Sequence, residues 1–149
     1  MNGFAYIYAK QEYEFSKELT YKIQNILSTR GQDNSYIYLL DNILAIQNTT
    51  NNKVNNGLQE KHFFNNNKYK ILTDSRIDNL DELYLKYPEL YGLKDPEILI
   101  KLYEKFGQNF YSEIEGPLSF IIFDPENKTI NGCRDLFGQK PFYYLNDSN

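Results

Sequence analysis

Short apolar segments separated by polar turns constrain the fold of this chain more than any other feature of its sequence. Leu118–Phe123 is apolar at nearly every position, Asp124–Asn127 has the composition of a turn, and Thr129–Cys133 supplies a second strand. Two earlier stretches repeat this arrangement: Ser35–Ile46 around Asp41-Asn42, and Phe63-Phe64 with Tyr69–Thr73 around Asn65-Asn66-Asn67. Because strands joined by tight turns pair antiparallel, the sequence predicts antiparallel sheets.

The N-terminal part adds a strand, a helix and a loop to this pattern. Gly3–Tyr8 alternates small, aromatic and aliphatic residues as a strand does. Between Tyr13 and Thr29 apolar residues recur at the spacing of one helical face: Phe15, Leu19, Ile23, Ile26 and Leu27. Gly31 then stands where a helix C-cap is expected, and the polar stretch Gln47–Gly57 predicts a loop.

Two further helices are expected between the second and third hairpins. The acidic pair Asp81-Glu82 opens a short helix that runs toward Tyr87-Pro88. Asp95 is a candidate N-cap for a longer helix, which has Pro96 at its first position and stops at Gly107. Hairpins with helices grouped between them predict an α+β fold, in which helices cover mostly antiparallel sheets.

Composition limits the functions open to the chain. Its 149 residues are enough for one domain, expected over 1–149, and the net charge of −4 argues against nucleic acid or an anionic membrane as a partner. No apolar run approaches the ~20 residues of a membrane span, so we expect a cytoplasmic protein. A single cysteine, Cys133, and a single histidine, His62, exclude an internal disulfide and a histidine-rich metal site, and no metal is expected.

Four segments of the chain carry recognisable motifs. In chain order they are Met1-Asn2-Gly3-Phe4, Arg30-Gly31-Gln32-Asp33, Asp74-Ser75-Arg76-Ile77-Asp78-Asn79, and Arg134-Asp135-Leu136-Phe137-Gly138-Gln139-Lys140-Pro141-Phe142-Tyr143-Tyr144. They resemble the glutaminase domain of the asparagine synthetase family, whose members carry M-C-G-I, R-G-P-D, N-G-E-I-Y-N or D-G-R-I-D-N, and R-D-x-x-G-x-K-P-x-Y-Y. The resemblance covers nearly the whole chain and implies the four-layer αββα sandwich of N-terminal-nucleophile amidotransferases. Whether the chain includes the last strand of the family's domain stays an open alternative. The S-G-G-x-D-S loop of the family's ATP-pyrophosphatase domain is absent from the sequence.

The resemblance assigns the family's nucleophile position to Asn2. In the family a cysteine there attacks the side-chain amide of glutamine, with its own α-amine as base. A carboxamide has delocalised lone pairs and cannot form the thioester that a thiolate forms. Cys133 is no substitute, because a lone cysteine in a strand beside Arg134 is typical of packing. The sequence therefore predicts no glutaminase activity and no catalytic residue.

The family's substrate-binding positions are altered as well. The family binds the α-carboxylate of glutamine with an arginine after the early hairpin, and no arginine lies between Leu39 and Ile71. The oxyanion donors of the family's N-G pair match Asp74 and Ser75, and a carboxylate at Asp74 would repel the developing charge. The aspartate that binds the substrate ammonium matches Asp95, which a helix N-cap explains equally well. Asp74, Ser75 and Asp95 are the candidate ligand-binding residues.

Other motif residues are expected to maintain the architecture. Arg76 with Asp78, and Arg134 with Asp135, each place a guanidinium near a carboxylate, which can tie loops together. Solvated surface charges are the alternative. The full set of expected structural residues is Arg30, Gly31, Arg76, Asp78, Arg134, Asp135 and Gly138.

These observations favour a catalytically inactive glutaminase-like domain that serves as a scaffold or partner of an ATP-dependent amide-forming ligase. The expected partner is an ATP-pyrophosphatase-type synthetase domain or subunit, no cofactor is implied, and a homodimer stays open. Fourteen tyrosines, with Phe142, Tyr143 and Tyr144 near the C-terminal motif, indicate either an interface or half-buried sheet positions. Two alternatives remain: a working glutaminase of an asparagine synthetase, if Asn2 stands for a cysteine, and a small-ligand sensor that uses the old pocket around Asp74 and Asp95.

Overall fold

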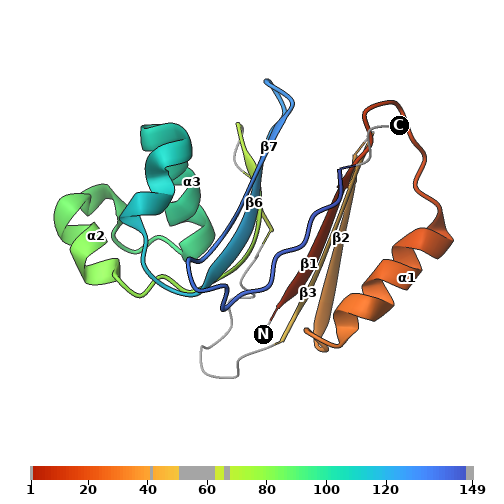
Figure 1. Ribbon diagram of the computed structural model, residues 1–149, viewed down its shortest axis with the longest axis horizontal. Helices are drawn as coiled ribbons and strands as arrows, with labels where there is room; N and C mark the ends of the chain where they lie inside the picture. The colour runs from red at the N-terminus through yellow and green to blue at the C-terminus, as the bar shows by residue number, and fades with distance from the viewer. Residues whose placement is uncertain (1, 41, 51–62, 66–67, 147–149) are drawn as a thin grey trace. The chain divides into compact units, whose positions relative to one another are not determined.

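The computed structural model describes residues 2–40, 42–50, 63–65 and 68–146 of the chain (Figure 1). The chain divides into two compact units, Met1–His62 and Phe63–Asn149, and each unit contains one antiparallel sheet with helices. Asp41 of the first predicted turn, Asn66-Asn67 of the second, and the part of the predicted loop after Thr50 lie outside the described residues.

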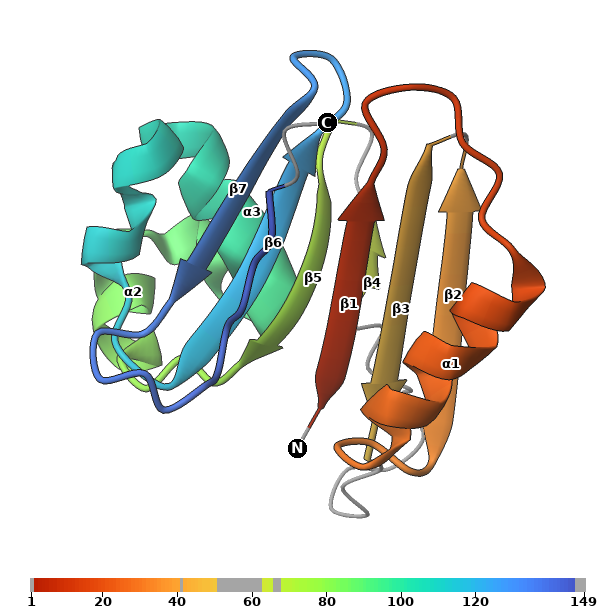
Figure 2. The ribbon, with the colours of Figure 1, turned by 45° about the vertical axis from the view of Figure 1, so that its right-hand side comes forward.

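The first unit consists of a three-stranded sheet and one helix. Its elements are β1 (Gly3–Tyr8), α1 (Lys17–Ser28), β2 (Asn34–Leu40) and β3 (Ile43–Thr49). The strand order is β1-β3-β2, so β3 is central and pairs antiparallel with both neighbours, as the opposed arrows in Figure 2 show. The predicted hairpin of β2 and β3 is confirmed, and β1 joins the same sheet beside β3.

Helix α1 packs on one face of this sheet through a single stripe of side chains. Leu19, Ile23 and Leu27 contact a core that is centred on Leu44 and Ile46. The helix begins four residues later than Tyr13, because the Ser16 side chain caps it by accepting from Leu19 N at 3.1 Å. Ile26, which was expected on the same face, is 70% exposed. A helix turns about 100° per residue, which places Ile26 beside the stripe rather than on it.

Gln47–Thr49 belongs to β3, so the prediction of a loop from Gln47 was wrong for these residues. All three side chains are buried despite their polarity. The Asn48 amide is satisfied because it accepts from Ser35 Oγ at 2.7 Å and donates to the Gln24 carbonyl at 3.0 Å. A central strand has backbone partners on both sides, and this pairing outweighs the low strand propensity of a polar run.

The second unit contains a four-stranded sheet of order β4-β5-β6-β7 and a helical layer. Its strands are β4 (Phe63–Asn65), β5 (Lys70–Ser75), β6 (Leu118–Asp124) and β7 (Thr129–Arg134). Its helices are α2 (Leu80–Lys86), the short 3₁₀ helix η1 (Pro88–Leu90), α3 (Asp95–Phe106) and the 3₁₀ helix η2 (Gly107–Glu113). All neighbouring strands pair antiparallel, which confirms the second and third predicted hairpins.

Helix α3 supplies most of the helical side of the core in this unit. Ile98, Leu99 and Leu102 are almost completely buried, and they belong to one cluster with Ile71 of β5 and Phe120 of β6. The helix ends at Gly107, where φ is +58°, as the sequence predicted. These contacts pack α3 against β5 and β6, the two central strands of the sheet.

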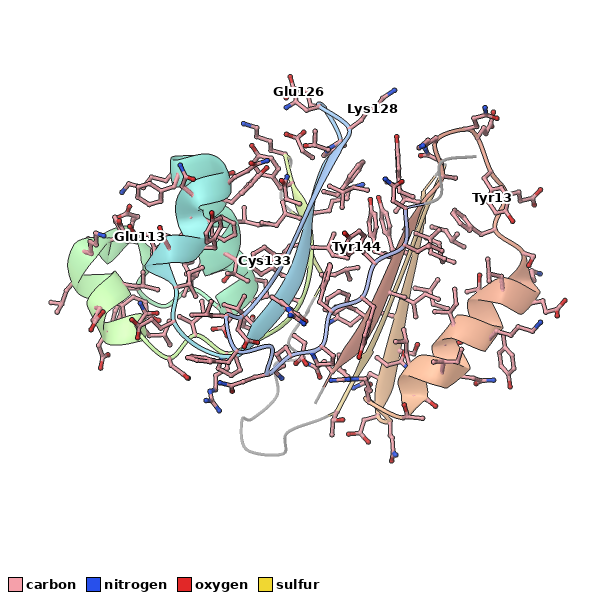
Figure 3. The ribbon with its side chains drawn as sticks, viewed as in Figure 1. Tyr13, Glu113, Glu126, Lys128, Cys133 and Tyr144 are labelled. Carbon is pink, nitrogen blue, oxygen red and sulfur yellow. The ribbon has the colours of Figure 1, made fainter. Side chains whose placement is uncertain are left out.

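The turn between β6 and β7 is organised by Asp124. Its carboxylate accepts from Glu126 N and Asn127 N, both at 3.0 Å, and from Asn127 Nδ2 at 2.8 Å. Figure 3 shows Glu126 and Lys128 at the tip of this turn. The turn predicted over 124–127 is therefore confirmed, and it is closed by a buried carboxylate.

The α+β class with two antiparallel sheets is confirmed. Each unit consists of one antiparallel sheet and one helical layer. These secondary-structure elements are consistent with the N-terminal-nucleophile amidotransferase fold that the motifs imply. Among the residues described, none of the helices is long and apolar enough to span a bilayer.

Candidate functional site

The motif residues divide between the two units. Asn2, Arg30 and Gly31 belong to the first unit, whereas Asp74, Ser75, Asp95 and the C-terminal motif belong to the second. Each group is therefore described within its own unit.

Asn2 precedes β1 and is half buried. Its side-chain Oδ1 accepts a long hydrogen bond of 3.4 Å from Thr50 N, just beyond the end of β3. The next residue, Gly3, pairs in register with Asn48. The carboxamide at this position is thus held beside the last residues of the central strand.

Arg30 and Gly31 shape the backbone next to the start of β1. A Cβ on Gly31 would lie 2.4–2.5 Å from backbone atoms of Asn48 and Thr49, so only glycine permits this approach. A Cβ on Gly3 would lie 3.1 Å from Arg30 Cβ. Gly31 was expected as a helix cap, but the C-cap of α1 is Thr29, and Gly31 serves close packing against β3 instead.

Asp74 lies in β5 and forms an ion pair with Lys140 of the C-terminal motif. Asp74 Oδ2 and Lys140 Nζ are 2.9 Å apart, and their side chains are 8% and 21% exposed. The backbone N–H of Lys140 also donates to Asp135 Oδ2 at 2.9 Å. The Lys140 ammonium therefore joins the C-terminal segment to β5, while its backbone N–H bonds within the loop that follows β7. The carboxylate at Asp74, the residue matched to the family's oxyanion donor by the sequence resemblance, is thus already paired with an ammonium group.

Ser75 follows Asp74 at the end of β5. Its Oγ is buried, and within the described part of the chain it has no hydrogen-bond partner. The residue pairs in register with Leu118 at the start of β6. Because successive side chains of a strand point to opposite faces, this hydroxyl lies on the other face of β5 from Asp74.

Asp95 is not the N-cap of α3, and this part of the sequence prediction was wrong by one residue. The N-cap is Lys94, whose backbone N–H donates to Glu97 Oε2 at 2.9 Å. Asp95 Oδ2 instead accepts from Ile77 N at 3.2 Å. The Asp95 carboxylate therefore joins α3 to the loop that follows β5 and stabilises this loop.

The Asn79 side chain also holds that loop, a role that the sequence reasoning missed. Asn79 Nδ2 donates to the Glu113 carbonyl at 2.9 Å, and its Oδ1 accepts from Glu115 N at 3.0 Å. Gly116, at φ +133°, lies so close to the Arg76 carbonyl that a Cβ would clash with it. The signal available in the sequence was the position of Asn79 at the end of the D-S-R-I-D-N motif.

Arg76 and Asp78 form the ion pair that their spacing suggested. Arg76 Nε and Asp78 Oδ1 are 2.7 Å apart, and Nη2 and Oδ2 are 3.1 Å apart, which makes the contact bidentate. Hydrogen bonding within the pair raises the pKa of Arg76 and lowers the pKa of Asp78. Both side chains are exposed, so the pair orders the loop locally and contributes little to stability.

Asp135, rather than Arg134, fixes the loop after β7. The Asp135 carboxylate accepts from Gln139 N at 2.8 Å and from Lys140 N, while the Asp135 N–H donates to the Leu118 carbonyl at 2.8 Å. Arg134 is exposed, and no ion pair involves it among the described residues, contrary to the expected contact with Asp135. Gly138, at φ +64°, allows the tight turn.

Cys133 is a packing residue in β7 (Figure 3). It is half buried against the core of its unit, and burial raises the pKa of its thiol. A raised pKa reduces the thiolate fraction at neutral pH, so the group is a poor nucleophile. Within the ranges described, no group of three histidine, cysteine, aspartate or glutamate side chains is placed to hold a metal ion.

The fold and the order of the motifs are those expected of a glutamine amidotransferase domain. The chain matches the family described as "Glutamine amidotransferase domain" over residues 1–149, and it belongs to that family.

The chain is similar to asparagine synthetases and to amidases. It is 34% identical over 93 residues to the putative asparagine synthetase [glutamine-hydrolyzing] 2 of Methanocaldococcus jannaschii, covering 53% of this chain and 18% of that relative. It is 30% identical over 127 residues to asparagine synthetase B [glutamine-hydrolyzing] of Escherichia coli, covering 82% and 23%. It is also 29% identical over 91 residues to the amidase chyE of Penicillium rubens, covering 59% and 13%. The matched region spans less than a quarter of the length of each of these relatives.

Proposed function

We propose that this chain is a catalytically inactive glutamine amidotransferase domain of the asparagine synthetase family, forming a single domain over 1–149. Its role is that of a scaffold or partner for an ATP-dependent amide-forming synthetase. The observation that carries the proposal is Asn2, because the motif that begins Met1-Asn2-Gly3 has a carboxamide where the family has its nucleophile. A carboxamide cannot form the acyl intermediate through which such enzymes hydrolyse glutamine.

The surroundings of Asp74 support the same proposal. An oxyanion needs preorganised donors at its developing charge. Asp74 brings a carboxylate to that position, and the Lys140 ammonium at 2.9 Å is already engaged with it. Glutamine hydrolysis would thus lack both its nucleophile and one of its donors.

A partner role is supported by the length of the relatives. Their names describe whole synthetases or amidases, of which the matched region is a minor part. We propose that an ATP-pyrophosphatase-type polypeptide supplies the remaining chemistry for this chain.

The contacts of Asp74 and Asp95 favour the scaffold over a ligand sensor. Asp74 forms an ion pair with Lys140, and Asp95 accepts from the backbone of Ile77. A ligand ammonium would have to compete with both contacts.

The test is glutamine hydrolysis. We expect the purified protein to release no ammonia from glutamine above a buffer control, and a glutamine-derived diazoketone to leave its mass unchanged. Asparagine synthetase B of Escherichia coli serves as the positive control. Asn2→Cys alone should also stay inactive, because each missing oxyanion donor costs roughly 3–4 kcal/mol of transition-state stabilisation. Slow but reproducible turnover by the unaltered chain would refute inactivity.

A further inference from the structure

The loop after β7 presents two large apolar side chains to solvent. Leu136 and Phe137 are 92% and 83% exposed, and they are adjacent in the chain. Isolated exposed apolar residues are ordinary, but a contiguous pair at the tip of a loop is a recurrent feature of binding surfaces.

The backbone of this loop is fixed, although the Leu136 and Phe137 side chains are exposed. Gly138 N donates to the Asp135 carbonyl at 3.0 Å, and the Asp135 carboxylate accepts from Gln139 N and Lys140 N. The Asp135 N–H and the Lys140 ammonium then join the loop to β6 and β5. A loop that is rigid before binding loses little conformational entropy when its side chains are buried by a partner.

The neighbouring aromatic residues behave differently from this pair. Phe142, one of the residues considered for an interface from the sequence, packs on Gly132, where a Cβ would lie 2.6 Å from its ring. Its role is therefore internal to the unit. Tyr143 and Tyr144 are exposed, and Figure 3 labels Tyr144 on the segment that leaves the loop.

We propose that Leu136 and Phe137 insert into an apolar groove of the synthetase polypeptide and form the anchor of that interface. This inference rests on the proposed function, since the relatives devote more than three quarters of their length to sequence outside the matched region. An exposed phenylalanine is of a residue type enriched at protein interfaces, and the adjacent Leu136 adds apolar surface beside it. The groove must be apolar where Leu136 and Phe137 enter it, because both side chains are hydrocarbon.

The experiment is site-specific photocrosslinking in the native cell. The full chain carries p-benzoylphenylalanine at position 137, or at Leu85 as a control that is equally exposed on α2. We expect position 137, and not position 85, to crosslink to a protein that mass spectrometry identifies by an S-G-G-x-D-S loop. In parallel, Leu136→Asp with Phe137→Asp should reduce the synthetase recovered with the chain at least tenfold, while Leu85→Asp should not change it.

The outcomes separate this inference from the proposed function. If the unaltered chain recovers no synthetase, the proposed partnership fails. If it recovers the synthetase but position 137 does not crosslink, or the double variant binds as well, the partnership stands and the loop is not its anchor. A crosslink between two copies of the chain would also overturn the inference, because it assigns the loop to self-association. Since the crosslinking variant retains an aromatic side chain at 137, it remains a test even if the double variant fails to fold.

Discussion

The ion pair between Asp74 and Lys140 provides the sharpest test of the structure. Replacing Lys140 with methionine keeps an unbranched apolar side chain but removes the ammonium, and leaves a carboxylate that is only 8% exposed without its cation. Replacing Asp74 with asparagine instead leaves a lysine that is 21% exposed and can extend into water. The two single variants should therefore differ in stability, with Lys140→Met the more damaging.

The magnitude follows from the geometry. At 2.9 Å and an effective dielectric constant of about 20, the attraction is about 6 kcal/mol, most of which desolvation and side-chain ordering offset. We expect Lys140→Met to lower the free energy of unfolding by about 2–3 kcal/mol, because a buried charge loses its partner. Asp74→Asn should cost about 1 kcal/mol, and the double variant should be less destabilised than the sum of the two singles by at least about 1 kcal/mol.

The assay is thermal and urea unfolding at neutral pH, followed by circular dichroism. For a chain of this length, 2–3 kcal/mol corresponds to a fall in Tm of about 4–12 °C. Lys22→Met is the matched control, because its pair with Glu18 is exposed and should contribute nothing measurable. Additive effects of the two substitutions would refute the pairing, as would equal losses from both singles.

Two further predictions concern stability. The pKa of Asp124 is lowered, chiefly by the hydrogen bond from the Asn127 side chain, and the pKa of Asp135 is lowered because hydrogen bonds from Gln139 N and Lys140 N outweigh its burial. A carboxyl whose folded pKa lies below its unfolded value stabilises the fold above the unfolded value, about pH 4, and this contribution is lost as pH falls through the folded pKa. Tm should thus fall on acidification toward pH 3, less steeply for Asp135→Asn, and an equal slope would contradict the assignment. Gly31→Ala should lower the free energy of unfolding by about 3 kcal/mol, because the added Cβ would clash with the backbone of Asn48 and Thr49. Gln32→Ala, at an exposed neighbouring position, is the control, and an equal Tm for the two variants would count against this packing.

Periodicity and turn chemistry predicted most of the elements. The three hairpins, α1 and α3 were visible because apolar spacing and turn residues act within a few positions of the chain. The same local rules misplaced the start of α1, since Ser16 caps it after the apolar run has begun. They also placed Gln47–Thr49 in a loop, because polarity alone does not reveal a strand that has partners on both sides.

The motif residues were found from the sequence, but several of their contacts were not. Asp95 was interpreted as a cap because it precedes Pro96, whereas its carboxylate accepts from Ile77 N, 18 positions earlier. Arg134 was assigned to the loop after β7, yet Asp135 accepts the backbone hydrogen bonds that hold it. Side-chain direction at the end of a strand depends on register and chain path, which leave no periodic trace in the sequence.

The sequence by itself determined the α+β class, the hairpins, the family resemblance and the presence of asparagine at position 2. These depend on residue type and short-range spacing. Only the tertiary structure decided that Asp74 is paired with Lys140, 66 positions away, and that Leu136 and Phe137 project from a loop fixed by Asp135. The physical reason is that ion pairs and hydrogen bonds between distant segments need their donor and acceptor atoms within about 3 Å of each other. Strand pairing and its register bring these atoms together, and residue type alone does not determine them.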